Sequence, residues 1–273
     1  MCELFAMSSS HPANVRFSLE AFSRHGGLEG PHKDGWGIAY YVDEDVRLFK
    51  EPHRAFDSAG LRFFQDHPFL SRTVLAHIRR ATLGAVTMKN CQPFVRELGG
   101  RMHAFAHNGH LEMGLLREQL PLGAFHPVGD TDSEYAFCAL LEQLRRFSAA
   151  MPQLGERVEV VSEFAATLRS LGPANFIYSD GDAMFIHGHK RFRADEAEAK
   201  PPGLHVLSRH CTSSAHEIEA KGLLIRGAND QSVLLAASVP LTVDRGWRPL
   251  GEGELLVARL GEIVSTSPLP AAH

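Results

Sequence analysis

The sequence predicts an α+β fold in which β-sheets are covered by helices. Many short apolar runs are separated by turn residues, which is typical of strands, while only a few stretches carry helical periodicity. Hydrophobic residues make up 44% of the 273 residues, which is enough to bury a full core, and 22% of the residues are charged.

In the first half of the chain, apolar runs predict strands at residues 2–7, 36–42, 46–50, 74–78 and 102–106. Val15, Leu19 and Phe22 recur at helical spacing, so we expect a helix over residues 12–25, ended by two glycines. The stretch from there to Asp34 is rich in Gly, Pro and His and is expected to be a loop.

The clearest helix of the second half spans residues 132–147, and Thr131 and Glu134 have the S/T-x-x-E spacing of a capping box at its start. A further helix is expected over residues 162–171, before Gly172 and Pro173. Short strands are expected at residues 175–178, 183–187, 205–208, 233–238 and 254–258. No stretch indicates a domain boundary, so we expect residues 1–273 to form a single domain.

Composition argues against several function classes. The formal net charge of −4 disfavours nucleic-acid binding, because phosphate contacts need clustered Lys and Arg, and we expect the short basic run His189–Arg193 to be a solvated loop. The four cysteines show no CxxC spacing, and the N-terminus lacks the features of a signal peptide. No apolar run is long enough to span a membrane. We therefore expect a cytoplasmic protein that binds neither nucleic acid nor membrane.

Cys2 is the first candidate for chemistry, because removal of Met1 would leave its thiol beside a free α-amine. An α-amine has a pKa of roughly 7.7–8.0, close to working pH, so it can act as the base that activates the thiol. Methionine is normally trimmed when the next residue is small, as cysteine is. Taken alone, a cysteine at this position is more often a small apolar side chain.

Three further clusters carry polar groups. Arg79 has a planar guanidinium, which pairs with a carboxylate through two parallel hydrogen bonds. Asn108 and Gly109 offer a side-chain amide and a backbone N–H, which suit an oxyanion hole but also occur in plain turns. Residues 130–134 place three carboxylates at a helix start, more than capping needs, so one of them is a candidate for binding an ammonium group.

Together the four clusters predict a site that none of them predicts alone. They supply a nucleophile with its own base, a carboxylate clamp, an oxyanion hole and an ammonium clamp. Free glutamine, or a γ-glutamyl group, carries an α-carboxylate and an α-ammonium beside a scissile γ-amide. The set therefore predicts a site for a small molecule of this kind.

The order and the sequences of these motifs resemble those of the class II glutamine amidotransferases, a family of the N-terminal nucleophile hydrolases. That family opens with Cys after Met and continues with H-x-R-x-A-T-x-G, H-N-G and D-T-D-T-E-like segments. The matching stretches here are His77–Gly84, His107–Gly109 and Asp130–Glu134. The opening M-C-E-L and the segment Gly30–Gly37 resemble the small stand-alone YafJ-like members, so the likeness covers nearly the whole chain.

The resemblance implies a four-layer αββα sandwich of the Ntn-hydrolase type, with two antiparallel sheets covered by helices. The glutamyl thioester formed in the reaction is hydrolysed to glutamate, and neither a metal nor an organic cofactor is implied. Roles are implied by position: attack on the γ-amide for Cys2, oxyanion stabilisation for Asn108 and Gly109, the α-carboxylate for Arg79, the α-ammonium for Asp132, and lining of the same pocket for Thr82.

The sequence departs from the family pattern at three positions. Arg80 and Leu83 stand where the sugar-phosphate-linked members have Trp and His, and Gln92 stands where close relatives are expected to have His. The familiar amidotransferases also carry a synthase domain or subunit that uses the ammonia, and we expect no room for one within these 273 residues. The acceptor is then absent, supplied by a separate synthase partner, or water.

Three alternatives stay open beside a stand-alone amidohydrolase. The chain could be the glutaminase subunit of a larger amidotransferase, or a catalytically silent ligand-binding protein on the same fold. A metal hydrolase is the third, prompted by 16 histidines and the pair His187 and His189. No carboxylate at metal-ligand spacing accompanies that pair, so we expect no metal site.

Overall fold

The structure is a computed structural model that describes residues 2–17, 34–55, 58–67, 69–81, 84–147, 151–193, 196–211, 217–220, 223–226, 230–241 and 246–267. The elements in these residues are, in chain order, β1 (Glu3–Phe17), β2 (Trp36–Val42), β3 (Asp45–Glu51), α2 (Ala59–Asp66), β4 (Leu70–Ile78), the short 3-10 helix η3 (Met88–Asn90), β5 (Phe94–Leu98), β6 (Arg101–Gly109), α3 (Met113–Gln119), α4 (Asp132–Arg145), α5 (Leu154–Leu171), β7 (Ala174–Ser179), β8 (Met184–His187), β9 (His205–Cys211), β10 (Glu217–Ala220), β11 (Leu223–Arg226), β12 (Gln231–Ala237), β13 (Arg248–Pro249), β14 (Leu255–Arg259) and β15 (Glu262–Ser267).

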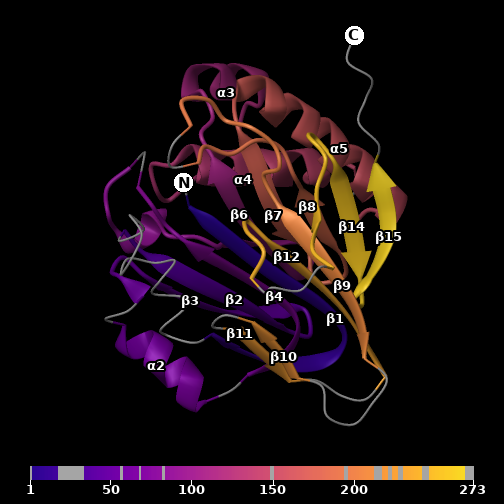
Figure 1. The fold of residues 1–273 in the computed structure, drawn as a ribbon. Helices are drawn as coiled ribbons and strands as arrows, with labels where there is room; N and C mark the ends of the chain where they lie inside the picture. Colours follow the sequence, from indigo (N-terminus) through magenta and orange to yellow (C-terminus); the bar gives the residue numbers. More distant parts are fainter. Residues whose placement is uncertain are drawn as a thin grey trace.

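The strands form two antiparallel sheets (Figure 1). The nine-stranded sheet has the order β13-β9-β12-β1-β4-β2-β3, with β11 paired to β1 and β10 paired to β11. The six-stranded sheet has the order β15-β14-β8-β7-β6-β5. Because β1 lies inside the larger sheet, the residue that precedes it is held between β4 on one side and β12 on the other.

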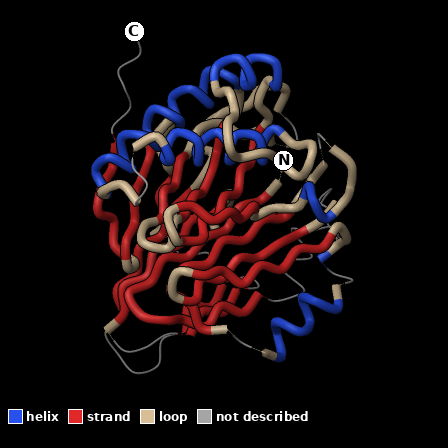
Figure 2. Tube along the Cα trace, turned by 180° about the vertical axis from the view of Figure 1, so that it is seen from behind, coloured by secondary structure: helices blue, strands red, loops and turns tan. Residues whose placement is uncertain are grey.

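Three hydrophobic cores separate four layers (Figures 1 and 2). Helices α3, α4 and α5 cover the outer face of the six-stranded sheet, where Phe105 and Phe137 stack with ring centroids 5.4 Å apart. The two sheets face each other across a core that includes Leu4 and Ile186, and Leu61 of α2 packs on the outer face of the nine-stranded sheet. The predicted α+β class and the αββα sandwich are confirmed.

The start of β1 shows why this strand is apolar on both faces. Side chains alternate along a strand, so Leu4 and Ala6 enter the core between the sheets, while Phe5 and Met7 enter the core beneath α2. Burial on both faces fixes the register, since a slip of one residue would exchange the two sets. The register places Glu3 opposite Ile78 at the end of β4.

The expectation of a helix over residues 12–25 is wrong where the structure describes that stretch. Residues up to Phe17 continue β1, and Asn14–Phe17 pair with β11. The register between β1 and β4 shifts between Ser8 and Ala13, which lets one long strand bend. Pairing with β4 and β11 makes the stretch up to Phe17 a strand, and residues 18–33, with Leu19 and Phe22, lie outside the described residues.

Helix α4 begins at Asp132 as predicted, and Thr131 caps it by accepting a hydrogen bond from the Glu134 N–H at 3.2 Å. The reciprocal half of the predicted capping box is replaced by other contacts. The Glu134 carboxylate accepts from the Gly129 N–H at 2.6 Å and pairs with Arg96 at 2.5 Å. These contacts fix the loop that leads into α4, and the helix start carries Asp132 to the site described below.

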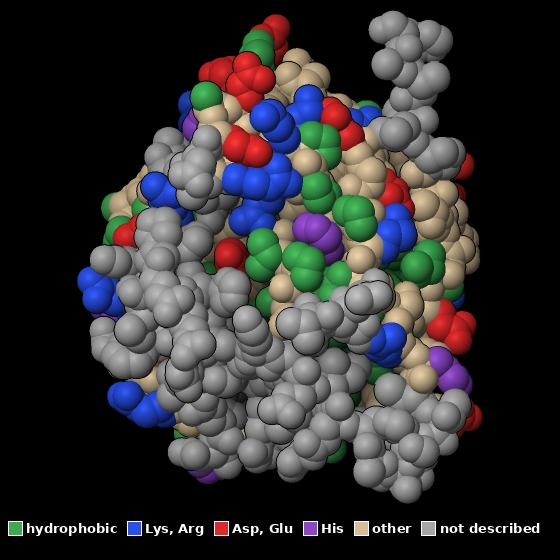
Figure 3. Space-filling view, viewed as in Figure 1, with side chains coloured by type: hydrophobic (Ala, Val, Ile, Leu, Met, Phe, Trp, Pro, Cys, Tyr) green, Lys and Arg blue, Asp and Glu red, His purple; other side chains and the backbone are tan. Residues whose placement is uncertain are grey.

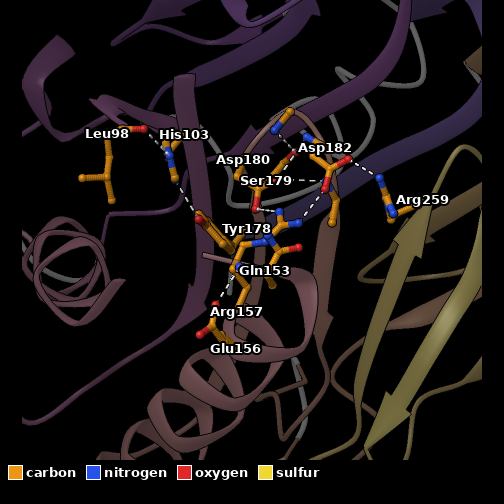
Figure 4. A network of polar contacts seen from close by, with 12 residues as sticks. Leu98, His103, Gln153, Glu156, Arg157, Tyr178, Ser179, Asp180, Asp182 and Arg259 are labelled. Carbon is orange, nitrogen blue, oxygen red and sulfur yellow. Dashed lines mark hydrogen bonds and ion pairs between the residues drawn. The ribbon is translucent and has the colours of Figure 1, made fainter. Parts of the chain in front are cut away.

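Arg157 connects α5 to the turn between β7 and β8, which follows Ser179 at the end of β7 (Figure 4). Its guanidinium pairs with the fully buried Asp180, and with Asp182 at 2.6 Å. Arg259 of β14 pairs with the second oxygen of Asp182 at 2.5 Å. The chain of ion pairs therefore ties the helical layer to the sheet beneath it. Every helix within the described residues is too short or too polar to cross a membrane.

Candidate active site

Cys2 lies at the edge of the sandwich where β1 begins and β4 ends. Its Sγ is 3.1 Å from the backbone nitrogen of Arg80 and 3.3 Å from the backbone oxygen of the same residue. The backbone of Arg79 is held in turn by Gly35, whose carbonyl accepts the Arg79 N–H at 2.8 Å. The turn after β4 therefore encloses the thiol from one side.

Burial is the main influence on the Cys2 thiol and raises its pKa above the ordinary value. The backbone N–H of Arg80 and the charge of Arg79 act in the opposite direction, and the charge of Asp132 adds to the increase. The raised pKa keeps the thiol protonated at neutral pH, so a nucleophilic role needs a base. Arg79 and Asp132 both lie within electrostatic range of the sulfur.

Arg79 is buried, with 3% of its surface exposed, and its guanidinium is held by the loop that follows β4. Nη1 donates to the carbonyl of Ala85 at 3.0 Å, and Nη2 donates to the carbonyl of Gly84 at 3.1 Å. Each of these nitrogens carries a second N–H. The arrangement fixes the plane of the guanidinium near Cys2.

The three carboxylates before and within the start of α4 have different partners. Asp130 pairs with Lys89 at 2.8 Å, and Glu134 pairs with Arg96. Asp132 is buried and accepts from the backbone N–H groups of Leu111 at 2.7 Å and of Ser133 at 2.9 Å. Among the described residues it is the one of the three with no cationic partner.

Asn108 and Gly109 end β6, on the six-stranded sheet, and lie across from Cys2. The Asn108 side-chain amide donates to the backbone carbonyl of Cys2 and, at 3.3 Å, to the hydroxyl of Ser238. Gly109 is required by close approach, because a Cβ there would lie 1.7 Å from the carbonyl oxygen of Pro173. Four segments that are distant in sequence thus meet at one place.

Gln92 and Ser238 hold this meeting point together. The Gln92 side chain accepts from the backbone N–H of His107 at 2.6 Å and donates to its carbonyl at 3.2 Å, directly before Asn108. The Ser238 hydroxyl accepts from the backbone N–H of Leu4 at 3.0 Å as well as from Asn108. No sequence motif marks Ser238, because the two partners of its hydroxyl, Leu4 and Asn108, lie more than a hundred residues away along the chain.

The expectation of a solvated loop at His189–Arg193 is wrong for two of its residues. His189 and Arg191 are buried, with 6% and 8% of their surfaces exposed, and Arg191 donates to the carbonyl of Ser238 at 2.6 Å. The backbones of Arg191 and Lys200 pair in an isolated antiparallel bridge that holds the segment at this place. Sequence alone offered only the basic composition of this run, which does not report burial.

Other predicted site residues lie elsewhere. Thr82 and Leu83 fall outside the described residues, so the pocket-lining role of Thr82 stays a prediction. Burial lowers the pKa of His187 to about 3, and its ring accepts from Arg169 at 3.2 Å while its other nitrogen donates to the carbonyl of Ala174 at 2.7 Å. Across the described parts of the chain, no group of three or more His, Cys, Asp or Glu residues could hold a metal ion.

Comparison with known proteins gives the site a context. The whole chain, residues 1–273, matches the family model described as glutamine amidotransferases class-II. It is 36% identical to YafJ of Escherichia coli strain K12, a protein assigned to the glutamine amidotransferases, over 97% of this chain and 100% of YafJ.

Solved structures agree with the family match. The crystal structure of a predicted glutamine amidotransferase from Pseudomonas aeruginosa aligns with a TM-score of 0.75 at 33% identity, covering 96% of this chain and 99% of that one. The glutamine phosphoribosylpyrophosphate amidotransferase of Bacillus subtilis aligns with a TM-score of 0.55 at 15% identity, covering 97% of this chain and 48% of that one. The second likeness is one of fold alone.

Proposed function

The chain belongs to the class II glutamine amidotransferases, and from this premise we propose that it is an amidohydrolase in which Cys2 cleaves the γ-amide of glutamine or a γ-glutamyl compound. The observation that carries the proposal is the charge pattern around Cys2. A buried guanidinium at Arg79 and a buried carboxylate at Asp132 lie within electrostatic range of the same sulfur. Such a pair complements the α-carboxylate and α-ammonium of a glutamyl group.

In the proposed reaction, Met1 is removed and the freed α-amine of Cys2 takes the thiol proton, directly or through a water. Sγ bonds to the carbonyl carbon of the γ-amide, and the electron pair of the C=O bond moves to oxygen, where Asn108 and Gly109 stabilise the charge. The C–N bond then breaks, and the leaving amine takes the proton from the α-ammonium of Cys2. Water hydrolyses the thioester, which gives glutamate and restores the thiol.

Substrate binding in this proposal uses groups that the fold holds rigidly. Arg79, whose guanidinium is held by the Gly84 and Ala85 carbonyls, binds the α-carboxylate, and Asp132 binds the α-ammonium. Thr82 is proposed to line the same pocket. The raised pKa of the Cys2 thiol supports the need for the α-amine as a base.

A glutaminase subunit that passes ammonia to a separate synthase is the second candidate. It is favoured by the extent of the fold likeness to the B. subtilis enzyme, in which this chain spans 48% of the longer protein. Affinity purification from the native cell distinguishes the two candidates. A stoichiometric partner whose product depends on glutamine supports the subunit, and its absence supports the stand-alone enzyme.

The proposal is tested with a diazo-ketone analogue of glutamine. We expect the Met-trimmed protein to gain one label at Cys2 and to release glutamate from glutamine, and Cys2→Ala to lose both properties. The buried Cys91 and Cys138 serve as internal controls, because both are free thiols. Labelling at Cys91, or full activity in Cys2→Ala, would contradict the proposal. Absence of both labelling and glutamate release in the Met-trimmed wild type would favour a silent binding protein.

A further inference from the structure

Arg191 is a buried cation beside the site that no step of the proposed reaction uses. It lies in the segment after β8, and 8% of its surface is exposed. Its one side-chain hydrogen bond within the described residues runs from Nη1 to the carbonyl of Ser238. The buried Nε has no partner among the described residues. A buried guanidinium usually satisfies its donors, because unpaired charged donors are costly, so the open N–H groups indicate a ligand.

The neighbouring cations of the same segment provide a contrast. Lys190 pairs with Glu252 at 2.7 Å and Arg193 pairs with Glu196 at 3.2 Å, and their side chains are 38% and 40% exposed. Figure 3 shows Lys and Arg side chains with Asp and Glu beside them in the upper part of the face viewed. Lys190 and Arg193 are each paired with a surface carboxylate, whereas the buried Arg191 makes no ion pair within 4 Å in the described chain, and the charge of Glu3 acts on it only from a longer distance.

Arg191 lies within electrostatic range of Glu3 and Cys2. Burial lowers the pKa of Arg191, and the charge of Glu3, together with negative charge on Cys2 when its thiol ionises, opposes this effect. Through Ser238, Arg191 is also one residue removed from Asn108, since Ser238 receives hydrogen bonds from both side chains.

His205 marks the same region as polar. This residue opens β9, and its Nδ1 is buried without a partner among the described residues. Burial lowers the pKa of His205, the Ser238 backbone opposes this, and the charges of Arg191 and Arg193 lower it further. Two buried polar atoms without partners therefore lie around Ser238, which suits a polar ligand better than an apolar one.

The sheet order separates this region from the glutamyl clamp. Arg79 follows β4, on one side of β1, while Ser238 follows β12 and His205 opens β9, on the other side of β1. Cys2 lies between them at the start of β1. A substrate whose α-carboxylate and α-ammonium occupy Arg79 and Asp132 thus has its scissile bond at Cys2 and its leaving group on the Arg191 side.

From this geometry we infer that Arg191 forms a subsite for a carboxylate on the leaving group, so that the preferred substrate is a γ-glutamyl amino acid or peptide. The inference rests on the proposed function. When free glutamine is cleaved, the leaving group is ammonia, which has no carboxylate for Arg191 to bind. In a γ-glutamyl amino acid, by contrast, a carboxylate lies one carbon from the scissile nitrogen, and guanidinium pairs well with carboxylate.

The test compares three substrates that differ only in the leaving group. Glutamate release is measured from γ-glutamylglycine, from its uncharged amide γ-glutamylglycinamide, and from glutamine. We expect kcat/KM to be roughly tenfold or more higher for the charged dipeptide than for its amide, as for a charge-assisted hydrogen bond. Arg191→Met should reduce this ratio to near one, Arg191→Lys should keep part of it, and Lys190→Met, which removes an exposed charge, should leave it unchanged.

A loss of folded protein lowers kcat/KM equally for the charged dipeptide and its amide, so their ratio is not affected by it. The ratio of the wild-type protein tests the subsite without any substitution. Equal wild-type kcat/KM for the charged dipeptide and its amide would overturn the subsite while leaving the proposed function intact. A ratio that persists in a folded Arg191→Met protein would also overturn it, since another group would then bind the carboxylate. Absence of glutamate release from all three substrates would instead overturn the proposed function, and this inference with it.

Discussion

At the scale of single residues, the charged side chains around Cys2 differ in what neutralises them. Asp130 and Glu134 have cationic partners and hold the loop before α4, whereas Asp132 accepts from two backbone N–H groups and from the Ser133 hydroxyl, and none of these donors is charged. Arg79 donates to the carbonyls of Gly84 and Ala85, which fix its guanidinium. A buried carboxylate that has no cation among the described residues, as is the case for Asp132, is one that a positively charged ligand can complete.

Asn108 is the residue whose replacement tests the oxyanion role most directly. We expect Asn108→Ala to lower kcat by roughly 10²–10³, the loss typical of one oxyanion donor, with a smaller change in KM. Steady-state glutamate release measures both constants. Ser238→Ala is the control, because this variant keeps the Asn108 side-chain amide and removes only the hydroxyl that accepts from it. We expect kcat of Ser238→Ala to fall by no more than about tenfold. An unchanged kcat in Asn108→Ala would remove this residue from the role.

Much of the candidate site could be predicted because its residues lie in short segments with distinctive sequence motifs. Cys2, Arg79, Asn108 and Asp132 were selected in this way. The structure places Asn108 in hydrogen-bond contact with Cys2, and Arg79 and Asp132 within its electrostatic range, while their roles stay predictions. Ser238 and Arg191 could not be found, because a lone serine and a basic run carry no local signal. Their importance comes from a hydrogen bond between residues 47 positions apart.

At the scale of elements, the strands that bury both faces were the most predictable. β2 has the bounds that the sequence predicted, since a continuous apolar run flanked by turns has few other interpretations. β1 was extended by partners that its own sequence does not reveal, and the helix expected at residue 12 was lost to them. α5 begins at Leu154, before the predicted start. The prediction missed the first turns because Glu156 and other polar residues there interrupt the apolar spacing, although Glu156 forms a capping box with Gln153.

The attachment of α5 to the sheet depends on Arg157. We expect Arg157→Met to lower the free energy of unfolding by about 3–5 kcal/mol, because the variant leaves the buried Asp180 carboxylate without its cation. Arg259→Met is the matched control. Arg259 is 43% exposed, so its pair with Asp182 should contribute about 1 kcal/mol or less. Urea unfolding measures both, and a loss below about 1 kcal/mol in Arg157→Met would contradict the expectation.

At the scale of the whole molecule, three cores hold the four layers, and several histidines are enclosed between them. Burial lowers the pKa of His187 to about 3 and that of His189 to about 4, and it also lowers the pKa values of His103, His107 and His205. These rings are neutral in the folded protein at neutral pH. That residues 1–273 form one domain stays a prediction.

Folding stability should therefore fall as the pH drops from about 6.5 towards 5. The unfolded chain takes up protons on these histidines near pH 6.5, whereas the folded chain keeps the His187 and His189 rings neutral until about pH 3 and 4. Urea midpoints between pH 7.5 and 5 measure the effect, in a range where most carboxylates stay ionised in both states. His187→Gln should show a shallower decline than the wild type, even if it is less stable at pH 7. A midpoint that is flat over this range would contradict the expectation.

The central place of β1 in the nine-stranded sheet has a consequence for biosynthesis. β1 leaves the ribosome well before one of its two partners at the Cys2 end, β12, which begins at Gln231. The segment that carries Cys2 must therefore wait, unpaired on one side, until β12 has been made. In the proposed function, an aminopeptidase acts on Met1 during that interval and exposes the α-amine. Processing of the N-terminus then comes first, and enclosure of Cys2 between its two neighbouring strands comes second.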